Sequence, residues 1–506
     1  MTTEQLAANT IKALSMDGVQ KANSGHPGAP MGMADLATIL WARFLKVDPT
    51  DPQWPDRDRF VLSNGHASML IYSLLHLSGF PMPLEQLQSF RQWGSHTAGH
   101  PEYAPELGIE MTTGPLGQGF GTGVGMAVAE VHLRSVFGPG LVDHRTWAFV
   151  SDGDLMEGIS YETASLAGHL GLGKLTYLYD DNEISIDGST DLTFTEDVPA
   201  RFAAAGWHTV DIDGHDHDAI DEAIRQATAV ADQPSLIIAH THIGIGAPNK
   251  QDTAAAHGSP LGPEEIAGWR ASVGWPDVDF HVPDQARQLF QTAMDRGTAA
   301  RGEWESRLAE TTADVRAEWD TYFDPQPITL EDPGFVVGES VATRASMGKL
   351  FDQIAENVPG FIGGAADLVA STKTEISFSG GFSRDNPAGR NIHFGIREHA
   401  MGTITNGIAL HGGLRPYGAT FFIFNDYMRP AVRLSALMDI PSIWVYTHDS
   451  FYLGEDGPTH QPIEQLASLR AMPNMMVFRP ADAGEMLDTW QTVLNQSSPA
   501  VILGTR

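Results

Sequence analysis

Two short polar stretches decide the fold of this chain: Ser151-Asp152-Gly153-Asp154-Leu155-Met156-Glu157 and Tyr179-Asp180-Asp181-Asn182-Glu183-Ile184. Each stretch follows an apolar run, at residues 145–150 and 175–179, that predicts a buried strand, and residues 158–170 between them predict a helix. A strand–helix–strand connection within one sheet returns the second strand parallel to the first. Both stretches are therefore expected at the carboxyl edge of a parallel sheet, where open α/β sheets bind ligands.

Asp152 and Asn182 are the expected ligands of a divalent cation. A carboxylate, an amide oxygen and a nearby backbone carbonyl make an incomplete octahedron, which Mg²⁺ accepts when a phosphate-bearing ligand supplies the remaining oxygens. The implied ligand is therefore a diphosphate. Asp and Asn are also common turn formers and helix N-caps, an alternative that accounts for the Asp-Gly pair alone but not for two such loops at this spacing.

The paired loops resemble the thiamine diphosphate fingerprint, a Gly-Asp-Gly loop followed by a helix and an Asn loop. Ser151 stands where the first glycine is usual, and a serine is disfavoured there if the backbone needs a positive φ. The resemblance implies a metal site made by Asp152, Asn182 and the backbone of Ile184. It also implies thiamine diphosphate and Mg²⁺ as cofactors, with Ca²⁺ or Mn²⁺ able to substitute.

Composition limits the kind of protein. The chain has 506 residues, enough for two or three domains with sizeable cores. Its net charge of −32 repels phosphate backbones and anionic bilayers, so neither nucleic acid nor membrane is expected as a partner. The chain has no cysteine, which excludes disulfides and thiolate sites. We find no signal segment and no apolar run of bilayer length, so a cytoplasmic location is expected.

The chain divides once clearly. Residues 1–318 alternate strand-like and helix-like patterns and end in a charged helix expected around Glu303 to Trp319. Residues 319–335 are rich in proline and predict an extended linker. Residues 336–506 form a second α/β unit, which opens with a helix near Ala342. Its predicted strands lie at residues 361–366, 416–421, 443–446 and 476–478.

Seven further motifs, most of them rich in Gly, Pro or His, follow one another along the chain. They are Ser24-Gly25-His26-Pro27-Gly28, Ser63-Asn64-Gly65-His66, Gly99-His100-Pro101-Glu102, Gly114-Pro115-Leu116-Gly117-Gln118-Gly119, His257-Gly258, Ile396-Arg397-Glu398-His399-Ala400-Met401-Gly402 and Leu453-Gly454-Glu455-Asp456-Gly457-Pro458-Thr459-His460-Gln461-Pro462. Together and in this order they resemble transketolase, from near residue 5 to the last residue. Transketolase chains normally continue into a third domain, so the resemblance implies that this domain is absent or that the sequence is cut after Arg506.

The resemblance implies an α/β fold of two thiamine diphosphate-binding-type domains, each a parallel sheet flanked by helices. Residues 1–318 would bind the diphosphate and metal, and residues 336–506 the pyrimidine ring. In the family the active site is shared between the two subunits of a homodimer. The implied cofactor-binding residues are His66, Gly114, Pro115, Leu116, Gly153, Asn182, His257 and Phe424.

Histidines carry much of the predicted substrate chemistry. An imidazole changes charge near neutral pH, so several in one polar cleft can orient sugar hydroxyls and move protons without a metal. By the resemblance, His26, His100 and His460 contact the ketose, with His26, His257 and His460 counted as catalytic. Asp456 contacts the hydroxyl next to the carbonyl. The alternative is that these histidines are unconnected loop residues among the 20 in the chain.

Glu398 is the expected acid. A carboxylic acid hydrogen-bonded to the aminopyrimidine ring promotes loss of the cofactor C2 proton, and an apolar surround raises a carboxyl pKa to suit that role. The alternatives are a helix-start carboxylate or an ion pair with Arg397. Phe421, Phe424 and Tyr427 are spaced by three, which on spacing alone predicts a helix core stripe. The resemblance instead stacks Phe424 on the pyrimidine ring.

Phosphate recognition is assigned by the resemblance to Arg344, Ser371, His448 and Arg506, since a guanidinium binds a phosphate with two hydrogen bonds. Two departures from the family leave the substrate range open. Ile245 stands where transketolases commonly carry a lysine, and residues 254–256 are alanines in a lid loop that is usually more polar.

The sequence therefore predicts a transketolase, which transfers a two-carbon ketol unit from a ketose phosphate such as xylulose 5-phosphate to an aldose phosphate such as ribose 5-phosphate. One alternative is deoxyxylulose phosphate synthesis, against which the residues around Glu398 argue. The other is a cofactor-free homologue that acts as a dimeric binding or scaffold protein.

Overall fold

The computed structural model describes residues 1–506, which form two compact units. The first unit comprises residues 1–123 and 143–307, and the second comprises residues 124–142 and 308–506. Helix α6, Gln118–Phe137, begins in the first unit and continues in the second. None of the helices combines the length and the apolar character that a membrane crossing requires.

The first unit is built on a sheet of five parallel strands. In spatial order they are β1 Arg59–Leu62, β2 Thr146–Ser151, β3 Leu175–Asp181, β7 Ser235–His240 and β6 His208–Asp213. Its helices are α1 Thr3–Ala22, α2 Gly28–Gly32, α3 Ala34–Ile39, α4 Ser68–Leu77, α5 Leu84–Gln88, α7 Asp152–Met156, α8 Gly158–Leu170, α9 Val198–Ala204, α10 His217–Ala229, α11 Pro263–Val273 and most of α12 Asp284–Ala309. The predicted strand–helix–strand unit is thus β2, α8 and β3, with the two strands parallel as expected.

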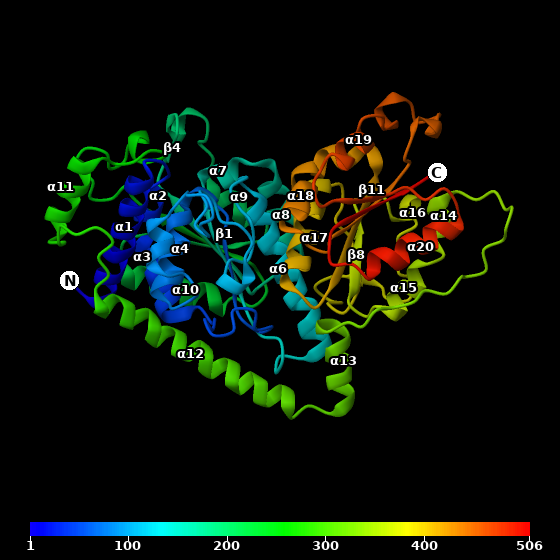
Figure 1. Ribbon diagram of the computed structural model, residues 1–506, viewed down its shortest axis with the longest axis horizontal. Helices are drawn as coiled ribbons and strands as arrows, with labels where there is room; N and C mark the ends of the chain where they lie inside the picture. The colour runs from blue at the N-terminus through cyan, green and yellow to red at the C-terminus, as the bar shows by residue number, and fades with distance from the viewer. The chain divides into compact units, whose positions relative to one another are not determined.

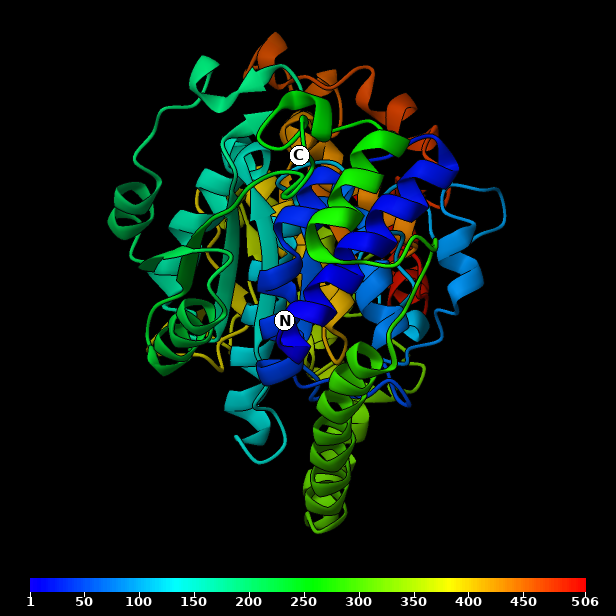
Figure 2. The ribbon, with the colours of Figure 1, turned by 90° about the vertical axis from the view of Figure 1, so that its left-hand side faces the viewer.

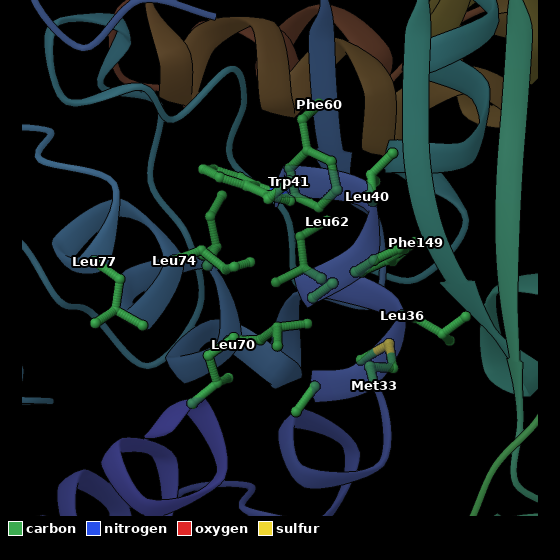
Figure 3. Close-up of a cluster of buried hydrophobic side chains, with 14 of the residues drawn as sticks. Met33, Leu36, Leu40, Trp41, Phe60, Leu62, Leu70, Leu74, Leu77 and Phe149 are labelled. Carbon is green, nitrogen blue, oxygen red and sulfur yellow. The ribbon is translucent and has the colours of Figure 1, made fainter. Parts of the chain in front are cut away.

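The core of the first unit lies between this sheet and helices α1, α3 and α4. Strand residues such as Phe60, Leu62 and Phe149 are buried against Trp41 and the leucines of α4 (Figure 3). The Phe60 ring meets Phe149 edge-on at 5.2 Å between centroids, an arrangement that aromatic pairs favour. Helix α12 is seen from its side in Figure 1 and more nearly along its axis in Figure 2. The packed core beneath the sheet holds the strands in place, so the loops at the carboxyl edge of the sheet start from fixed positions.

The second unit is built on a sheet of seven parallel strands. In spatial order they are β13 Met476–Phe478, β14 Ala500–Gly504, β12 Ile443–Thr447, β11 Arg415–Phe421, β8 Phe361–Ala365, β10 Asn391–Ile392 and β9 Gly381–Phe382. Its helices are α13 Ala313–Phe323, α14 Thr343–Gly348, α15 Phe351–Asn357, α16 Val369–Thr372, α17 Glu398–His411, α18 Asn425–Met438, α19 Gln465–Arg470 and α20 Ala483–Leu494. The four predicted strands are present, and the prediction missed β9, β10 and β14.

The predicted charged helix over residues 303–319 is wrong in one respect, because it is two helices. Helix α12 ends at Ala309, and Thr312 caps α13 by accepting a hydrogen bond from the Val315 amide. A threonine hydroxyl at this position satisfies an amide that the helix itself leaves unpaired. The proline-rich segment that follows is tied to α20, since the Leu330 amide donates to Gln491 at 2.6 Å.

Candidate active site

The carboxyl edge of the first sheet carries the predicted metal ligands. Asp152 follows β2, is 5% exposed, and accepts a hydrogen bond from the Tyr179 hydroxyl. Ser151 has an extended backbone with φ −134°, so the serine in place of glycine causes no strain. Burial raises the pKa of Asp152 to about 7, and no basic side chain pairs with it. A buried carboxylate without a cation is a group that a metal ion would stabilise.

Asn182 is oriented by its neighbours on the same edge. Its amide nitrogen donates to Asp180 at 2.8 Å, and its Oδ1 accepts from the Ile184 amide at 3.1 Å. Glu183 between them has a φ of 58°, which turns the chain sharply. No group of three or more His, Cys, Asp or Glu side chains is arranged to hold a metal. The donor set of one carboxylate, one amide and one backbone carbonyl nevertheless fits Mg²⁺ completed by phosphate oxygens.

Four of the five predicted histidines converge in the first unit. The ring of His26 lies 5.3 Å from His66, 6.0 Å from His100 and 5.8 Å from His257, measured between centroids. His66 and His257 are stacked at 5.1 Å. The interpretation of unconnected loop histidines is therefore wrong for these four residues. They come from loops far apart in the sequence.

Burial lowers the pKa of these imidazoles and so favours their neutral form. Burial, with smaller effects from His257, Arg91 and His100, lowers the pKa of His26 to about 4. Burial lowers the pKa of His66, His100 and His257 as well. The buried Nδ1 of His257 has no hydrogen-bond partner within the protein. Because an unpaired buried polar atom is costly, this nitrogen fits a polar ligand.

Contacts through the Gly114–Gly119 loop join the histidines to the edge that carries the predicted metal ligands. A Cβ at Gly114, whose φ is 127°, would lie 3.0 Å from the His100 ring, so only glycine fits there. A Cβ at Gly153 would lie 2.7 Å from the Leu116 side chain. The histidines, this loop and Asp152 thus form one continuous site. Pro115 is exposed at its rim.

The predicted lid loop lies beside the same histidines, and part of it is packed. Residues 254–256 form a short 3₁₀ turn, and Ala256 is fully buried. A Cβ at Gly28 would lie 2.5 Å from the Ala256 carbonyl oxygen, so this turn rests directly on the glycine of the His26 loop. Ile245 packs partly buried against the apolar cluster beneath it. Ala256 and Ile245 therefore have a packing role, whereas Ala255 is exposed.

The second unit gathers the remaining predicted residues at the carboxyl edge of its own sheet. Arg344 Nη1 donates to the Ser371 carbonyl at 3.0 Å and lies 3.3 Å from His448 Nε2. Burial, with the charges of Arg344 and Arg506, lowers the pKa of His448 to about 4. Arg506 is ion-paired with Glu455, and its Nη1 lies 3.9 Å from Asp456 Oδ1. The predicted phosphate-binding residues are thus close together.

The helix core stripe suggested by Phe421, Phe424 and Tyr427 is wrong. Phe421 ends β11, Phe424 lies in a 3₁₀ turn, and Tyr427 is 64% exposed on α18. The Phe421 and Phe424 rings stack at 6.0 Å, and His460 lies 5.3 Å from Phe424. The aromatic rings line an edge because the chain changes from strand to turn to helix within seven residues. Glu398 is buried at the first position of α17.

The prediction missed three residues of the first site. Arg91 Nη2 lies 3.4 Å from His26 Nδ1, Tyr179 bridges Asp152 and Asp181, and Asp154 accepts hydrogen bonds from three segments. Tyr179 and Asp154 lie within the quoted stretches, so their position was a usable signal. Arg91 has no motif around it, and only the fold brings it to His26.

Comparison with known proteins places the chain in a family. Family models match the transketolase thiamine diphosphate-binding domain over residues 3–322 and the transketolase pyrimidine-binding domain over residues 339–506. The chain is similar to transketolase of Halalkalibacterium halodurans, with 49% identity over 99% of this chain and 77% of that protein. It is 46% identical to transketolase of Bacillus subtilis over 100% of this chain and 78% of that protein.

Solved transketolase structures have the same fold as this chain. The crystal structure of transketolase from Campylobacter jejuni matches with a TM-score of 0.96 and 45% identity, covering 100% of this chain and 78% of that one. This chain belongs to the transketolase family. It is a transferase that moves a two-carbon ketol unit between sugar phosphates, with thiamine diphosphate and a divalent metal as cofactors. Neither alternative function is favoured by these matches.

Proposed function

We propose that this transketolase takes xylulose 5-phosphate as donor and ribose 5-phosphate as acceptor. Crystal structures of Pichia stipitis transketolase hold sedoheptulose 7-phosphate or, in mutants, fructose 6-phosphate and xylulose 5-phosphate, and their aligned sequence is 41% identical to this chain. The observation that carries the proposal is the cluster of four neutral histidines joined to the Asp152 edge. A neutral imidazole can donate to one sugar hydroxyl and accept from another.

The cofactor is proposed to be held by residues of both units. When bound, thiamine diphosphate supplies the carbon nucleophile and the electron sink of the reaction. Asp152, Asn182 and the Ile184 carbonyl would bind the metal, and Phe424 would stack on the pyrimidine ring. His66, Gly114, Pro115, Leu116, Gly153 and His257 would contact the rest of the cofactor. Glu398 would hold a proton against the aminopyrimidine ring, which its buried position at α17 favours.

The sugar is proposed to be held by the remaining residues. His26, His100 and His460 would bind its hydroxyls and carbonyl, and His26, His257 and His460 would also move protons there. Asp456 would accept from the hydroxyl next to the carbonyl. Arg344, Ser371, His448 and Arg506 would bind the phosphate, and a guanidinium beside a neutral imidazole suits this anion.

Calorimetry with thiamine diphosphate and Mg²⁺, followed by a panel of donors and acceptors, tests this proposal. We expect cofactor binding that requires the metal, and the highest kcat/KM for the pair named above. Chelation of the metal should abolish binding. A chain that binds no cofactor, or one that turns over only non-phosphorylated sugars, would contradict the proposal.

We further propose that the chain forms a homodimer whose active sites are shared between subunits. The second unit exposes several large apolar side chains, which a partner subunit would cover. Among them are Ile396 at 80%, Tyr427 at 64%, Phe451 at 55% and Tyr452 at 86% exposure. Residues 1–318 are proposed as the diphosphate-binding domain and 336–506 as the pyrimidine-binding domain, joined by 319–335. Cytoplasm remains the proposed location.

Mixing two inactive variants tests the shared site. If Asp152 and Glu398 act in one site from opposite subunits, subunits with Asp152→Ala and subunits with Glu398→Gln regenerate one intact site in each mixed dimer. Random mixing should then restore about a quarter of the wild-type activity. A mixture that stays inactive, with light scattering showing mixed dimers, would place both residues on one subunit. Monomers with full activity would exclude the dimer itself.

A further inference from the structure

Asp154 is a fully buried carboxylate whose four hydrogen-bond donors come from three segments. Its Oδ1 accepts from Ser63 Oγ at 2.6 Å and from the Gly117 amide at 2.7 Å. Its Oδ2 accepts from the Ser151 amide at 3.0 Å and the Ser151 hydroxyl at 3.3 Å. No basic side chain forms an ion pair with it. An ionised carboxylate accepts about four hydrogen bonds, so donors from the protein itself saturate this one.

Each of the three segments also carries residues assigned above to the cofactor. Ser63 begins the turn that places His66, Gly117 belongs to the loop of Gly114 and Leu116, and Ser151 directly precedes Asp152. Gly117 can be held only through its backbone. Its φ is 77°, and a Cβ would lie 2.5 Å from Ile159, so the segment at this point offers only backbone atoms. A carboxylate facing that amide is a direct way to fix the loop.

Helix capping alone does not explain this arrangement. Ser151 and Asp154 form a capping box at the start of α7, which accounts for the bonds to Ser151. The bonds from Ser63 and Gly117 bring in two segments that are 91 and 37 residues away in sequence. Hydrogen bonds to an ionised acceptor are about twice as strong as neutral ones. The carboxylate thus ties together three segments that also pack on one another, at Gly119 against Ser63 and at Gly153 against Leu116.

We propose that Asp154 is a positioning residue of the transketolase reaction, which holds the three cofactor-binding segments in a single arrangement. This inference rests on the proposed assignment of His66, Leu116 and Asp152 to the cofactor. Asp154 is not expected to touch substrate or cofactor. Its loss should therefore weaken cofactor binding, while the turnover of the fully loaded enzyme changes little.

The Asp154→Asn variant tests the proposal, because it keeps the shape but turns an amide NH₂ toward donors. We expect the dissociation constant of thiamine diphosphate with Mg²⁺ to rise about 10- to 100-fold, as for other residues that orient metal-site ligands. At saturating cofactor, kcat should stay within about threefold of wild type. Calorimetry gives the dissociation constant independently of activity.

Asp58→Asn is the matched control. Asp58 is also a buried carboxylate of the first unit, and it accepts from the Lys46 and Arg145 amides and from Trp147 Nε1, at 2.9 to 3.1 Å. None of these donors belongs to a segment assigned to the cofactor. We expect Asp58→Asn to lower the thermal midpoint and leave cofactor affinity unchanged. Equal changes in cofactor affinity in both variants would reduce Asp154 to a structural residue.

Ser63→Ala keeps the inference testable if Asp154→Asn does not fold. It removes one donor without changing charge, and we expect the cofactor dissociation constant to rise about fivefold. Unchanged cofactor affinity in the folded variants overturns the positioning role while the proposed function stands. Failure of the wild-type chain to bind the cofactor overturns the proposed function as well.

Discussion

The carboxyl edges of the two sheets have the same architecture but opposite chemistry. In the first unit this edge carries buried carboxylates, and burial raises the pKa of Asp152 to about 7 and of Asp154 and Asp180 to about 6. In the second unit it carries stacked rings and guanidinium groups, among them Phe424, Arg344 and Arg506. A parallel sheet therefore supplies a place for ligands, and the residues after each strand decide which ligand.

This difference in chemistry indicates that the two edges bind different parts of the cofactor and substrate. An edge with carboxylates lacking cations suits a metal and, through it, a diphosphate. An edge of rings and guanidinium groups suits a flat heterocycle and a sugar phosphate. Substitutions at the first edge should therefore change mainly the binding of the metal and diphosphate. Substitutions at the second edge should change chemistry and ring or phosphate recognition.

The largest effect is expected from Glu398→Gln, at the proposed acid of the second unit. The amide cannot donate a proton in the same way, so kcat should fall by about 100-fold or more with cofactor affinity little changed. Steady-state kinetics at saturating cofactor measures this. Glu485→Gln is the control, because Glu485 is also a first-turn carboxylate of a helix in this unit. A kcat of Glu398→Gln within threefold of the wild-type value would contradict a catalytic role for the second edge.

Asp152→Asn should have the next largest effect, on binding rather than on turnover. Removing the ligand charge should weaken Mg²⁺-dependent cofactor binding on the order of 100-fold. A Mg²⁺ titration in the presence of thiamine diphosphate, monitored by circular dichroism, measures this change in affinity. The neighbouring Asp181→Asn is the control, since Asp181 also accepts from Tyr179 but is not a proposed ligand. The assignment fails if both variants lose affinity equally.

A smaller effect is expected in the pH dependence of stability. His26 has a pKa of about 4 when folded, below its ordinary value of 6.5, so the unfolded chain binds more protons between these values. The free energy of unfolding should therefore fall with acidification between pH 7 and pH 5, by on the order of 1 kcal/mol from His26 once solvent screening is allowed for. Denaturant unfolding at the two pH values measures this.

His26→Asn should remove that part of the pH dependence. His96→Asn, at an exposed loop residue, is the control and should leave it in place. If both variants keep the full slope, His26 is not held neutral by burial.

The smallest effect is expected from Phe424→Leu. Loss of aromatic stacking costs about 0.5–1.5 kcal/mol, so cofactor affinity should fall roughly 3- to 10-fold with kcat nearly unchanged. Phe422→Leu is the control, because Phe422 is 1% exposed and should affect stability instead. Equal cofactor affinity in Phe424→Leu and wild type would contradict the proposed stacking of Phe424 on the cofactor.

Much of the fold could be predicted because strands in parallel sheets are short apolar runs with polar residues at their carboxyl ends. For this reason the sequence predicts β2, β3, β11 and β12, and it places Asp152 and Asn182 at one edge of the sheet. Strands β9 and β10 have two residues each, too few to show a period. The break between α12 and α13 depends on a single capping threonine within a continuous charged pattern.

The amino-acid sequence by itself determined the chemistry at each strand end, because a residue that directly follows a parallel strand must lie at the carboxyl edge. Only the tertiary structure decided which distant side chains meet there. His26, His66, His100 and His257 span more than 200 residues of sequence, and Asp154 receives donors from segments with no common pattern. Local periodicity carries no information about such contacts, since they arise from loops packing on a completed sheet.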